Sequence, residues 1–386
     1  MVKFTVNKFL TLVTFFIICF LIYAFYISQF EFQLFSAKNS KSSFFYDYKI
    51  SQNIHTNYST GSGTVASITD EAKRTHQDFL MFTDTNIAPN LEIDRYQNQI
   101  GLLFGYKTTS ETFRTVNYSY DKSSAITTTD LKIESPIIKK GFDLKHLINT
   151  DADGLEVINL KQISQNSWDK SKISTIWSIL LYPFNPRLSL MRLYSEPMEE
   201  LRIFDQISQK RNISLFLGAE VTAKAIPITN LIMKFPSYER VLSVGSQHLL
   251  LTSELTGNIN IDKIKIIQAL KKGQFYIAFD ELGETTGFEI YSENLKNKKK
   301  SFMGDAIAFQ KDQKIYYKLP SEPNIFFEVV LYKNGIRLDH LNTFEGSFLI
   351  KTPGVYRVQV RLSPQLPLPD AIKWLSWIYT NNFYFR

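Results

Sequence analysis

Three side chains that could bind a divalent cation lie in or directly beside apolar runs of this sequence. His55 lies in "NIHTNYSTGSGT", Asp84 ends "DFLMFTD", and Glu220 lies in "SLFLGAEV". Imidazole and carboxylate groups are ligands that zinc and manganese take from proteins. Metals held this way polarise a phosphoryl oxygen and generate hydroxide from bound water. These residues therefore raise the question of a divalent-metal site.

The elements that would position these residues alternate between strand and helix. Short apolar runs predict strands at 78–84, 99–106, 154–160 and 214–221. Helical spacing predicts helices at 68–76, with Thr69 as a possible cap, and at 196–211. Such alternation predicts a parallel α/β sheet or barrel, with active-site residues at the carboxyl ends of the strands.

The pattern changes near residue 285, where apolar and polar residues begin to alternate in "KIYYKLP", "NIFFEVVLYKNGIRL" and "GVYRVQVRL". Asn334-Gly335 predicts a hairpin, and Pro353-Gly354 marks another turn. We therefore expect a small antiparallel β-sandwich at 285–386. The aromatic residues near its end predict the sandwich core; they are Trp374, Trp377, Tyr379, Phe383, Tyr384 and Phe385.

An uncharged stretch at 9–30 predicts one transmembrane helix, because it is long enough to cross a hydrocarbon core of about 30 Å. Lys3 and Lys8 precede it, so the positive-inside rule places the rest of the chain on the non-cytoplasmic side of the inner membrane. A cleaved signal peptide is the alternative, but its apolar part is usually shorter. We expect an anchor at 1–30 and a tether at 31–48.

Composition excludes some classes of site. The chain has 386 residues and a net charge of +7, and the single Cys19 excludes an internal disulfide and a Cys/His zinc finger. The basic residues are scattered apart from "KNKKK" at 296–300, which we interpret as a solvated loop. No nucleic-acid partner is expected.

Several landmarks occur in order and suggest a family. They are "IHTNYSTGSGTVASITDEAKRTHQDFLMFTDTN", "GLEVINL", "GAEVTA", "FPSYERVLSVGSQHLLL" and the closing "KWLSWIYTNNFYFR". Over residues 48–386 the chain resembles the PHP (polymerase and histidinol phosphatase) phosphoesterases, in particular members with a β-sandwich tail. The resemblance implies a distorted (β/α)7 barrel at 49–284 that holds divalent ions at the carboxyl ends of its strands.

At most of the family's ligand positions this chain carries a different residue. A His-x-His motif is replaced by Asn53-Ile54-His55, and the Asp of a "YSDG" turn by Thr60. Four further departures follow along the chain: Thr85 for His after Asp84, Lys107 for Glu after the third strand, Ser135 for the His of "AHP", and Glu220-Val221-Thr222 for Asp-x-His. His146, His248 and His340 fall at no matching position. We therefore expect no family-type metal centre; if a metal binds, His55, Asp84 and Glu220 would hold it.

Lys107 suggests what could replace the metal. Unpaired buried carboxylates are costly, so a Lys107 ammonium paired with Glu220 or Asp84 would supply the missing positive charge. The alternative is a solvated Lys107 on a loop. The remaining candidates have simpler interpretations. We expect His55 to be a hydrogen-bonded residue and His76 to lie on a helix surface. Glu156 would face the pocket or pair with a nearby base, and Tyr238 would contribute to packing.

Two functional classes follow from these residues. The first is a membrane-anchored PHP-like protein without catalysis that binds an envelope protein or a phosphorylated small ligand. The second is a phosphoesterase with a reduced Zn²⁺ or Mn²⁺ site. The sequence alone decides neither the ligand nor the oligomeric state.

Overall fold

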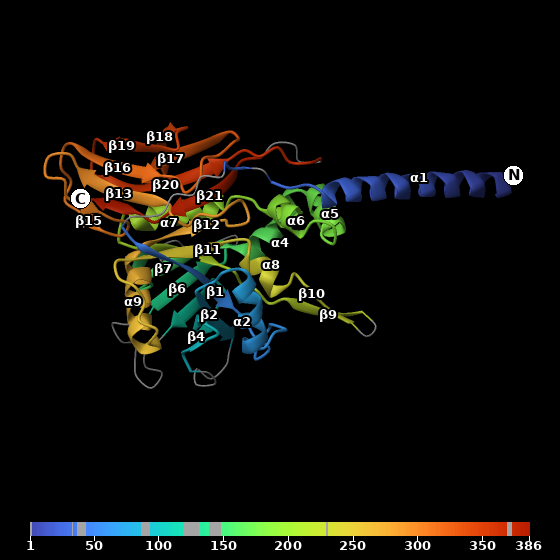
Figure 1. Cartoon of the computed structure of the whole chain (residues 1–386), viewed down its shortest axis with the longest axis horizontal. Helices are drawn as coiled ribbons and strands as arrows, with labels where there is room; N and C mark the ends of the chain where they lie inside the picture. The colour runs from blue at the N-terminus through green and yellow to red at the C-terminus, as the bar shows by residue number, and fades with distance from the viewer. Residues whose placement is uncertain are drawn as a thin grey trace.

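The computed structural model describes residues 2–32, 34–36, 44–85, 93–118, 131–138, 148–228, 231–368 and 373–386, with the side chains of 2–7 and 224–235 left aside. His146 lies outside the described residues. The fold is mixed α/β, and one long N-terminal helix, α1 (Val2–Ser28), projects from it (Figure 1). An 18-residue window within Lys8–Ser28 has a mean hydropathy of 2.5, so this helix is long and apolar enough to cross a membrane.

One sheet forms the centre of the molecule, and within the described residues it has 16 strands. Its path runs β15-β22-β20-β21-β12-β11-β1-β2-β4-β5-β6-β7-β8. The strands in the first half of the chain are β1 (Tyr46–Ile54), β2 (Phe79–Thr85), β3 (Arg95–Gln97), β4 (Ile100–Thr109), β5 (Phe113–Tyr118), β6 (Leu131–Pro136), β7 (Gly154–Asn159) and β8 (Ser214–Gly218). The pairs β1–β2, β2–β4, β6–β7 and β7–β8 are parallel, whereas β4–β5 and β5–β6 are antiparallel. The four strands predicted from apolar runs correspond to β2, β4, β7 and β8 and are confirmed.

This sheet curls so that its β8 end returns to β1. The backbone N–H of Ala219 donates to Gln52 O at 3.0 Å, and that of His55 donates to Val221 O at 3.1 Å. The carboxyl ends of β1 and β8 therefore lie side by side, so residues from both strands can meet in one site. The regular alternation of a (β/α)7 barrel is not reproduced, because β4, β5 and β6 pair antiparallel and four helices fall between β7 and β8.

Seven further helices are described after α1, and six of them begin at a side-chain cap, whereas the helix that follows Pro197 has none. They are α2 (Val65–Arg74), α4 (Leu160–Lys170), α5 (Lys172–Leu181), α6 (Pro186–Leu193), α7 (Met198–Ser208), α8 (Tyr238–Leu242) and α9 (Ile259–Lys272). The prediction that Thr69 caps α2 is wrong: Thr64 accepts from the N–H of Ser67, and Thr69 lies inside the helix. His76 is exposed, but it follows the end of α2 with φ of 55°. Helix α7 confirms the helix predicted within 196–211.

The C-terminal part is β-rich. Its strands are β9 (Lys224–Ile228), β10 (Leu231–Phe235), β11 (Ser246–Leu251), β12 (Phe275–Ala278), β13 (Glu289–Asn294), β14 (Lys300–Ser301), β15 (Ala306–Ile307), β16 (Gln313–Lys318), β17 (Phe327–Lys333), β18 (Ile336–Leu341), β19 (Glu345–Ile350), β20 (Gly354–Leu362), β21 (Leu375–Thr380) and β22 (Phe383–Phe385). Asn334 and Gly335 have φ of 51° and 82° and join β17 to β18, which confirms the predicted hairpin.

The predicted boundary at residue 284 is crossed by hydrogen bonds. Strand β12 pairs with β11 on one side and with β21 on the other, so the large sheet is continuous from the β1 region into the tail. A separate four-stranded sheet, β14-β13-β16-β19, lies in the upper part of Figure 1. Trp377, Tyr379 and Phe383 are buried as expected, whereas Trp374 is exposed.

The described part of the predicted tether also packs on the fold. Leu34 is buried, and the ring centroid of Phe35 lies 4.4 Å from that of Trp377. Residues 46–48 belong to β1. These segments therefore form part of the folded structure.

One buried ion pair joins helix α7 to strand β20. The guanidinium of Arg357 donates to both carboxylate oxygens of Asp205, each at 2.9 Å, and both side chains are buried. We predict that Asp205→Ala lowers the free energy of unfolding by about 3–5 kcal/mol, because it leaves a buried guanidinium unpaired. Urea unfolding of the detergent-solubilised chain measures this change.

The matched control is Glu199→Ala, on the same helix. Glu199 pairs with Arg202 at 2.8 Å on the surface, and we expect a loss below about 1 kcal/mol. Equal losses in the two variants would contradict the importance of the buried pair. A double variant, Asp205→Leu with Arg357→Met, should recover part of the stability lost in Asp205→Ala.

Candidate functional site

Polar side chains gather where β1, β2, β4, β7 and β8 end. Asn53 belongs to β1, Lys107 to β4, Glu156 to β7, and Glu220 follows β8. These side chains are buried, although each carries polar or charged groups. Because parallel strands end at the same edge of a sheet, residues distant in the sequence meet here.

Lys107 forms the ion pair that the sequence suggested. Lys107 belongs to β4 and lies opposite Thr85 of β2 in the sheet. The residue is only 3% exposed. The ammonium Nζ lies 3.4 Å from Glu220 Oε1 and donates to Asn53 Oδ1 at 3.1 Å. The predicted pairing with Glu220 is therefore confirmed, and Lys107 does not lie solvated on a loop.

Glu220 is surrounded by donors. It accepts from Asn159 Nδ2 at 2.6 Å, from Arg114 Nη1 at 3.2 Å and from Lys161 Nζ at 3.3 Å, besides its contact with Lys107. Burial would raise its pKa, but Lys107, Arg114 and Lys161 outweigh that effect and lower the pKa of Glu220 to about 2. The carboxylate is therefore ionised at neutral pH.

A second carboxylate lies beneath this ion pair. Glu156 accepts from Asn53 Nδ2 at 2.9 Å and from Asn159 Nδ2 at 2.7 Å, and burial raises its pKa. Gly218 leaves the room for it, because a Cβ at that position would lie 1.9 Å from Glu156 Oε2. Glu156 thus faces the cluster, and the two asparagines connect it to Lys107 and Glu220.

The contacts of Asp84 are with the loop after β1 and not with the Lys107–Glu220 ion pair. Its oxygens accept from the N–H and the hydroxyl of Thr56, each at 2.7 Å, and from the Ser59 hydroxyl at 2.5 Å. The Tyr238 hydroxyl supports the same loop by accepting from the N–H of Gly63 at 3.1 Å and donating to His55 O at 2.8 Å. Asp84 therefore organises the loop after β1.

His55 is held neutral. Burial and then the nearby Lys107 lower its pKa to about 3. Its Nδ1 lies 3.5 Å from the Ser59 hydroxyl. Thr222 is half-buried, and its carbonyl accepts from the N–H of Ser62 at 3.0 Å. These residues shape the wall of the site.

A pocket of 240 Å³ lies beside the cluster. Glu220, Lys161 and Thr222 line part of it, and the rest is mostly apolar. The apolar part includes Leu160, Leu190, Met191, Val221, Val241 and Val244. Its lining therefore combines charged groups with a larger apolar wall.

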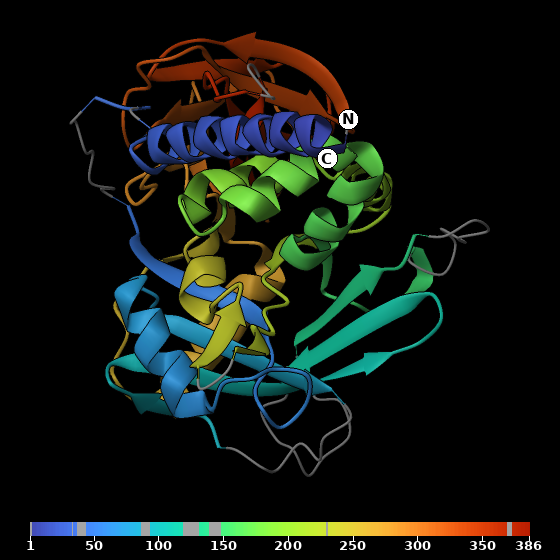
Figure 2. The same ribbon diagram turned by 90° about the vertical axis from the view of Figure 1, so that its right-hand side faces the viewer.

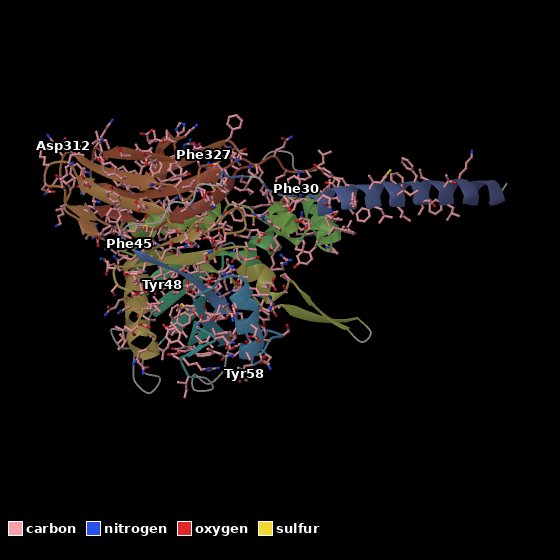
Figure 3. The ribbon with its side chains drawn as sticks, in the orientation of Figure 1. Phe30, Phe45, Tyr48, Tyr58, Asp312 and Phe327 are labelled. Carbon is pink, nitrogen blue, oxygen red and sulfur yellow. The ribbon has the colours of Figure 1, made fainter. Side chains whose placement is uncertain are left out.

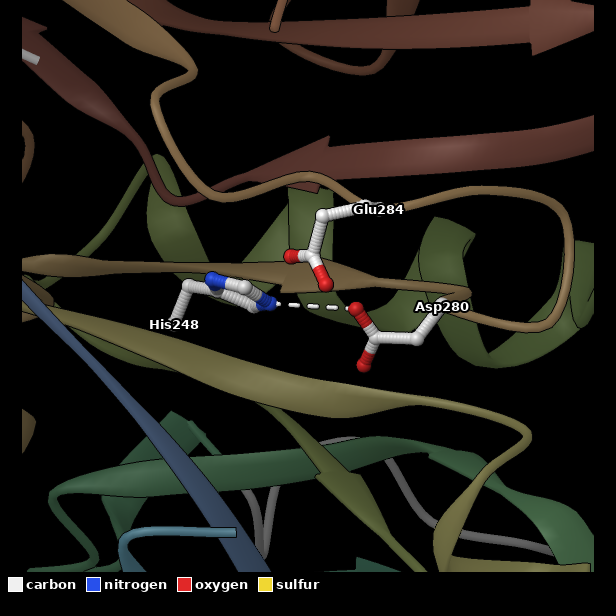
Figure 4. Close-up of side chains that lie close together, drawn as sticks. All are labelled: His248, Asp280 and Glu284. Atoms are coloured by element: carbon white, nitrogen blue, oxygen red, sulfur yellow. Dashed lines mark hydrogen bonds and ion pairs between the residues drawn. The ribbon is translucent and has the colours of Figure 1, made fainter. Parts of the chain in front are cut away.

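Potential metal ligands gather elsewhere. Among the described residues, His55, Asp84 and Glu220 do not bring their ligand atoms within 4.8 Å of one another, whereas His248, Asp280 and Glu284 do (Figure 4). His248 belongs to β11, and Asp280 and Glu284 follow β12. This group was not evident from the sequence, because His248 matches no family position and its partners come from other parts of the chain.

The His248 group also contains a lysine. Lys49 of β1 lies opposite His248 in the sheet, and its Nζ lies 3.4 Å from Asp280 Oδ1 and 3.0 Å from Glu284 Oε2. His248 Nδ1 lies 2.9 Å from Asp47, and its Nε2 lies 3.2 Å from Asp280. A metal ion would therefore compete with the Lys49 ammonium for both carboxylates.

Charge on His248 adds to this competition. Burial lowers the pKa of His248, but Asp47 and Asp280 outweigh it and raise that pKa to about 10. An imidazole must lose its proton before it binds a metal. Metal binding here would have to displace both a proton and an ammonium group.

The solved structures similar to this chain include one distant relative in fold. No protein-family model and no curated protein sequence matches this chain. A crystal structure of a two-domain protein from Bacteroides vulgatus, described as containing a predicted PHP-like metal-dependent phosphoesterase, aligns with 88% of this chain and 98% of its own. The identity is 11% and the TM-score 0.38. The interpretation of the site therefore rests on the residues of this chain.

The raised pKa of His248 predicts a pH-dependent stability. A group whose pKa is higher in the folded state stabilises the fold most below its unfolded pKa, here about 6.5, and loses this effect as the pH rises towards 10. We therefore predict that His248→Gln lowers the free energy of unfolding by several kcal/mol at pH 6, and by much less at pH 10. Urea unfolding over this pH range measures the difference.

The matched control is His340→Gln, which changes an exposed histidine of β18. We expect a small and nearly constant difference from the wild type across the same pH range. A His248→Gln difference that is flat with pH would contradict a buried imidazolium.

Proposed function

We propose that this chain is a membrane-anchored, PHP-like binding module without phosphoesterase activity, and that the pocket beside Glu220 binds a small phosphorylated ligand. The observation that carries this proposal is the buried Lys107 ammonium beside Glu220. It supplies positive charge at the strand ends where the resemblance implies divalent ions. A divalent ion at Glu220 would meet that ammonium at close range, which opposes metal binding.

The arrangement of donors supports a role without catalysis. Hydroxide formation at neutral pH requires a metal that lowers the pKa of bound water. Asp84 is engaged by Thr56 and Ser59, and Glu220 by three basic side chains and Asn159. Freeing these oxygens for a metal would break several charge-assisted hydrogen bonds.

The balance of charge supports an anionic ligand. Lys107, Arg114 and Lys161 contribute three positive charges against one on Glu220. The positive charges therefore outnumber the negative ones whether Glu156 is ionised or protonated. Lys161 lines the pocket and is partly exposed, so it can reach a phosphate group, while the apolar wall would cover an organic body.

The second candidate function remains a metal-dependent phosphoesterase. The His248, Asp280 and Glu284 group favours it, because this group could hold a metal ion. The proposed site at His55, Asp84 and Glu220 would instead need rearrangement of the hydrogen bonds described above. An envelope protein partner and the non-cytoplasmic placement of the fold also remain part of the proposal.

Metal content separates the two functions. We predict that the full chain, purified with added Mn²⁺ or Zn²⁺ and then desalted, holds no stoichiometric metal that depends on His55, because Lys107 opposes it. Elemental analysis of the wild type, His55→Ala and His248→Gln measures this. Stoichiometric metal that is lost in His55→Ala would contradict the proposal. Metal lost only in His248→Gln would locate the ion at the other group.

Ligand binding tests the pocket directly. We predict that phenyl phosphate binds the detergent-solubilised chain without being hydrolysed, and that Lys161→Met weakens the affinity about tenfold, as expected for one charge-assisted hydrogen bond. Isothermal titration measures the affinity, and phosphate release measures hydrolysis. Lys210→Met, which removes an exposed lysine after α7, is the matched control and should leave the affinity unchanged. Equal binding by the Lys161→Met variant would contradict the assignment of the pocket.

A further inference from the structure

Helix α5 exposes four large apolar side chains and buries three polar ones. Ile173, Ile176, Ile179 and Leu180 are exposed to 65%, 47%, 53% and 49%. The side chains that face the protein are Ser174, Thr175, Ser178 and Leu181. A helix on a water-soluble surface normally shows the reverse arrangement. The exposed face of α5 therefore lacks an apolar covering within the described structure.

Helix α1 is packed against α5 and α6 at its carboxyl end. Ala24 and Ile27 are buried with Leu181 and Leu188, and Asn185 Nδ2 donates to the carbonyls of Ile27 and Phe30 at 3.0 and 2.9 Å. The two helices lie at the base of α1 in both ribbon views, and Figure 3 shows Phe30 at this junction (Figures 1, 2 and 3). The position of α5 relative to α1 is thus fixed by direct contacts.

These contacts place α5 at a definite depth along α1. Trp177 of α5 lies with its ring centroid 6.3 Å from that of Phe20 and 5.3 Å from that of Tyr23. At about 1.5 Å per residue, Phe20 and Tyr23 lie roughly 12 and 8 Å before the end of α1 at Ser28. The span Lys8–Ser28 is about 32 Å long, close to the hydrocarbon thickness of about 30 Å. If α1 crosses a membrane over this span, Trp177 therefore lies roughly 8–12 Å inside its carboxyl end, so α5 enters the bilayer from that side.

From this geometry we infer that α5 lies in the surface of the membrane that α1 crosses, with Ile173, Ile176, Ile179 and Leu180 in contact with lipid. Residues at the ends of the helix suit the same position. Trp168 is exposed before α5, and Trp is enriched at membrane interfaces, while Phe184 adds exposed apolar surface after α5. Lys172 begins the helix and is exposed, so it can reach lipid phosphates.

The inference rests on the anchoring role proposed for α1 and goes beyond it. A single spanning helix on a flexible tether would leave the fold free to rotate. An α5 helix embedded beside it would fix one face of the fold against the bilayer. The occupant of the exposed face is therefore a lipid surface, and its apolar side chains contribute to membrane binding in addition to the span.

The test uses the full chain in vesicles of phosphatidylcholine and phosphatidylglycerol. Cys19 is changed to Ser, and nitroxide labels are placed at Ile176→Cys and Ile179→Cys in separate variants. Accessibility to oxygen, which concentrates in lipid, is compared with accessibility to a water-soluble nickel chelate. We expect a several-fold higher oxygen-to-nickel ratio at these positions than at Ile336→Cys, an exposed position on β18 away from α1.

Circular dichroism of each labelled chain checks that the fold is kept, and alkaline carbonate extraction checks the anchor separately. A chain that carbonate releases from the vesicles contradicts the membrane span. A retained chain whose Ile176 and Ile179 labels match the Ile336 label contradicts the position of α5 alone. Labels shielded from both reagents at high lipid-to-protein ratio indicate a protein contact and also overturn the inference.

Discussion

The need to neutralise buried carboxylates governs the centre of this structure. Glu220 lies where several strands end, and its charge is stabilised by Lys107, Arg114 and Lys161 rather than by solvent. Removing one partner from such a cluster leaves an uncompensated charge, which costs far more than a surface ion pair. The positions of β1, β4, β7 and β8 are therefore coupled, because Asn53, Lys107, Asn159 and Glu220 must keep their contacts together.

A second group of carboxylates, nearer to the β-rich tail, is also neutralised by basic side chains of the chain. Lys49 lies between Asp280 and Glu284, and a buried imidazolium at His248 lies between Asp47 and Asp280. Both groups contain carboxylates, and in both a lysine ammonium of the chain supplies positive charge. The two lysines come from strands of one sheet, so the sheet itself positions these internal cations.

Local sequence patterns predicted the strands and the Asn334-Gly335 hairpin, because each depends on nearby residues. The pairing of Lys107 with Glu220 or Asp84 was expected only from the family resemblance, and the structure pairs Lys107 with Glu220. The His248 group could not be found that way, since Asp47, Lys49 and Asp280 meet it only through sheet pairing. The continuity of β12 with β21 is equally non-local, and it explains why the change of pattern near residue 285 does not separate the hydrogen-bonded sheet. Thr69 failed as a cap because Thr64 satisfies the same helix end earlier.

Asn185 links helix α1 to the pocket beside Glu220. Its amide nitrogen bonds the end of α1, and its Oδ1 accepts from the N–H of Leu188 and so caps α6. Leu190 and Met191 of the same helix line the pocket beside Glu220. Helix α6 has only eight residues, so the end that contacts α1 and the residues that line the pocket lie within about two turns of each other. A displacement of α1 would therefore move the pocket wall with it. If α1 spans a membrane as proposed, these contacts would hold the pocket at a fixed height above the bilayer, and a ligand would have to reach it close to the membrane surface.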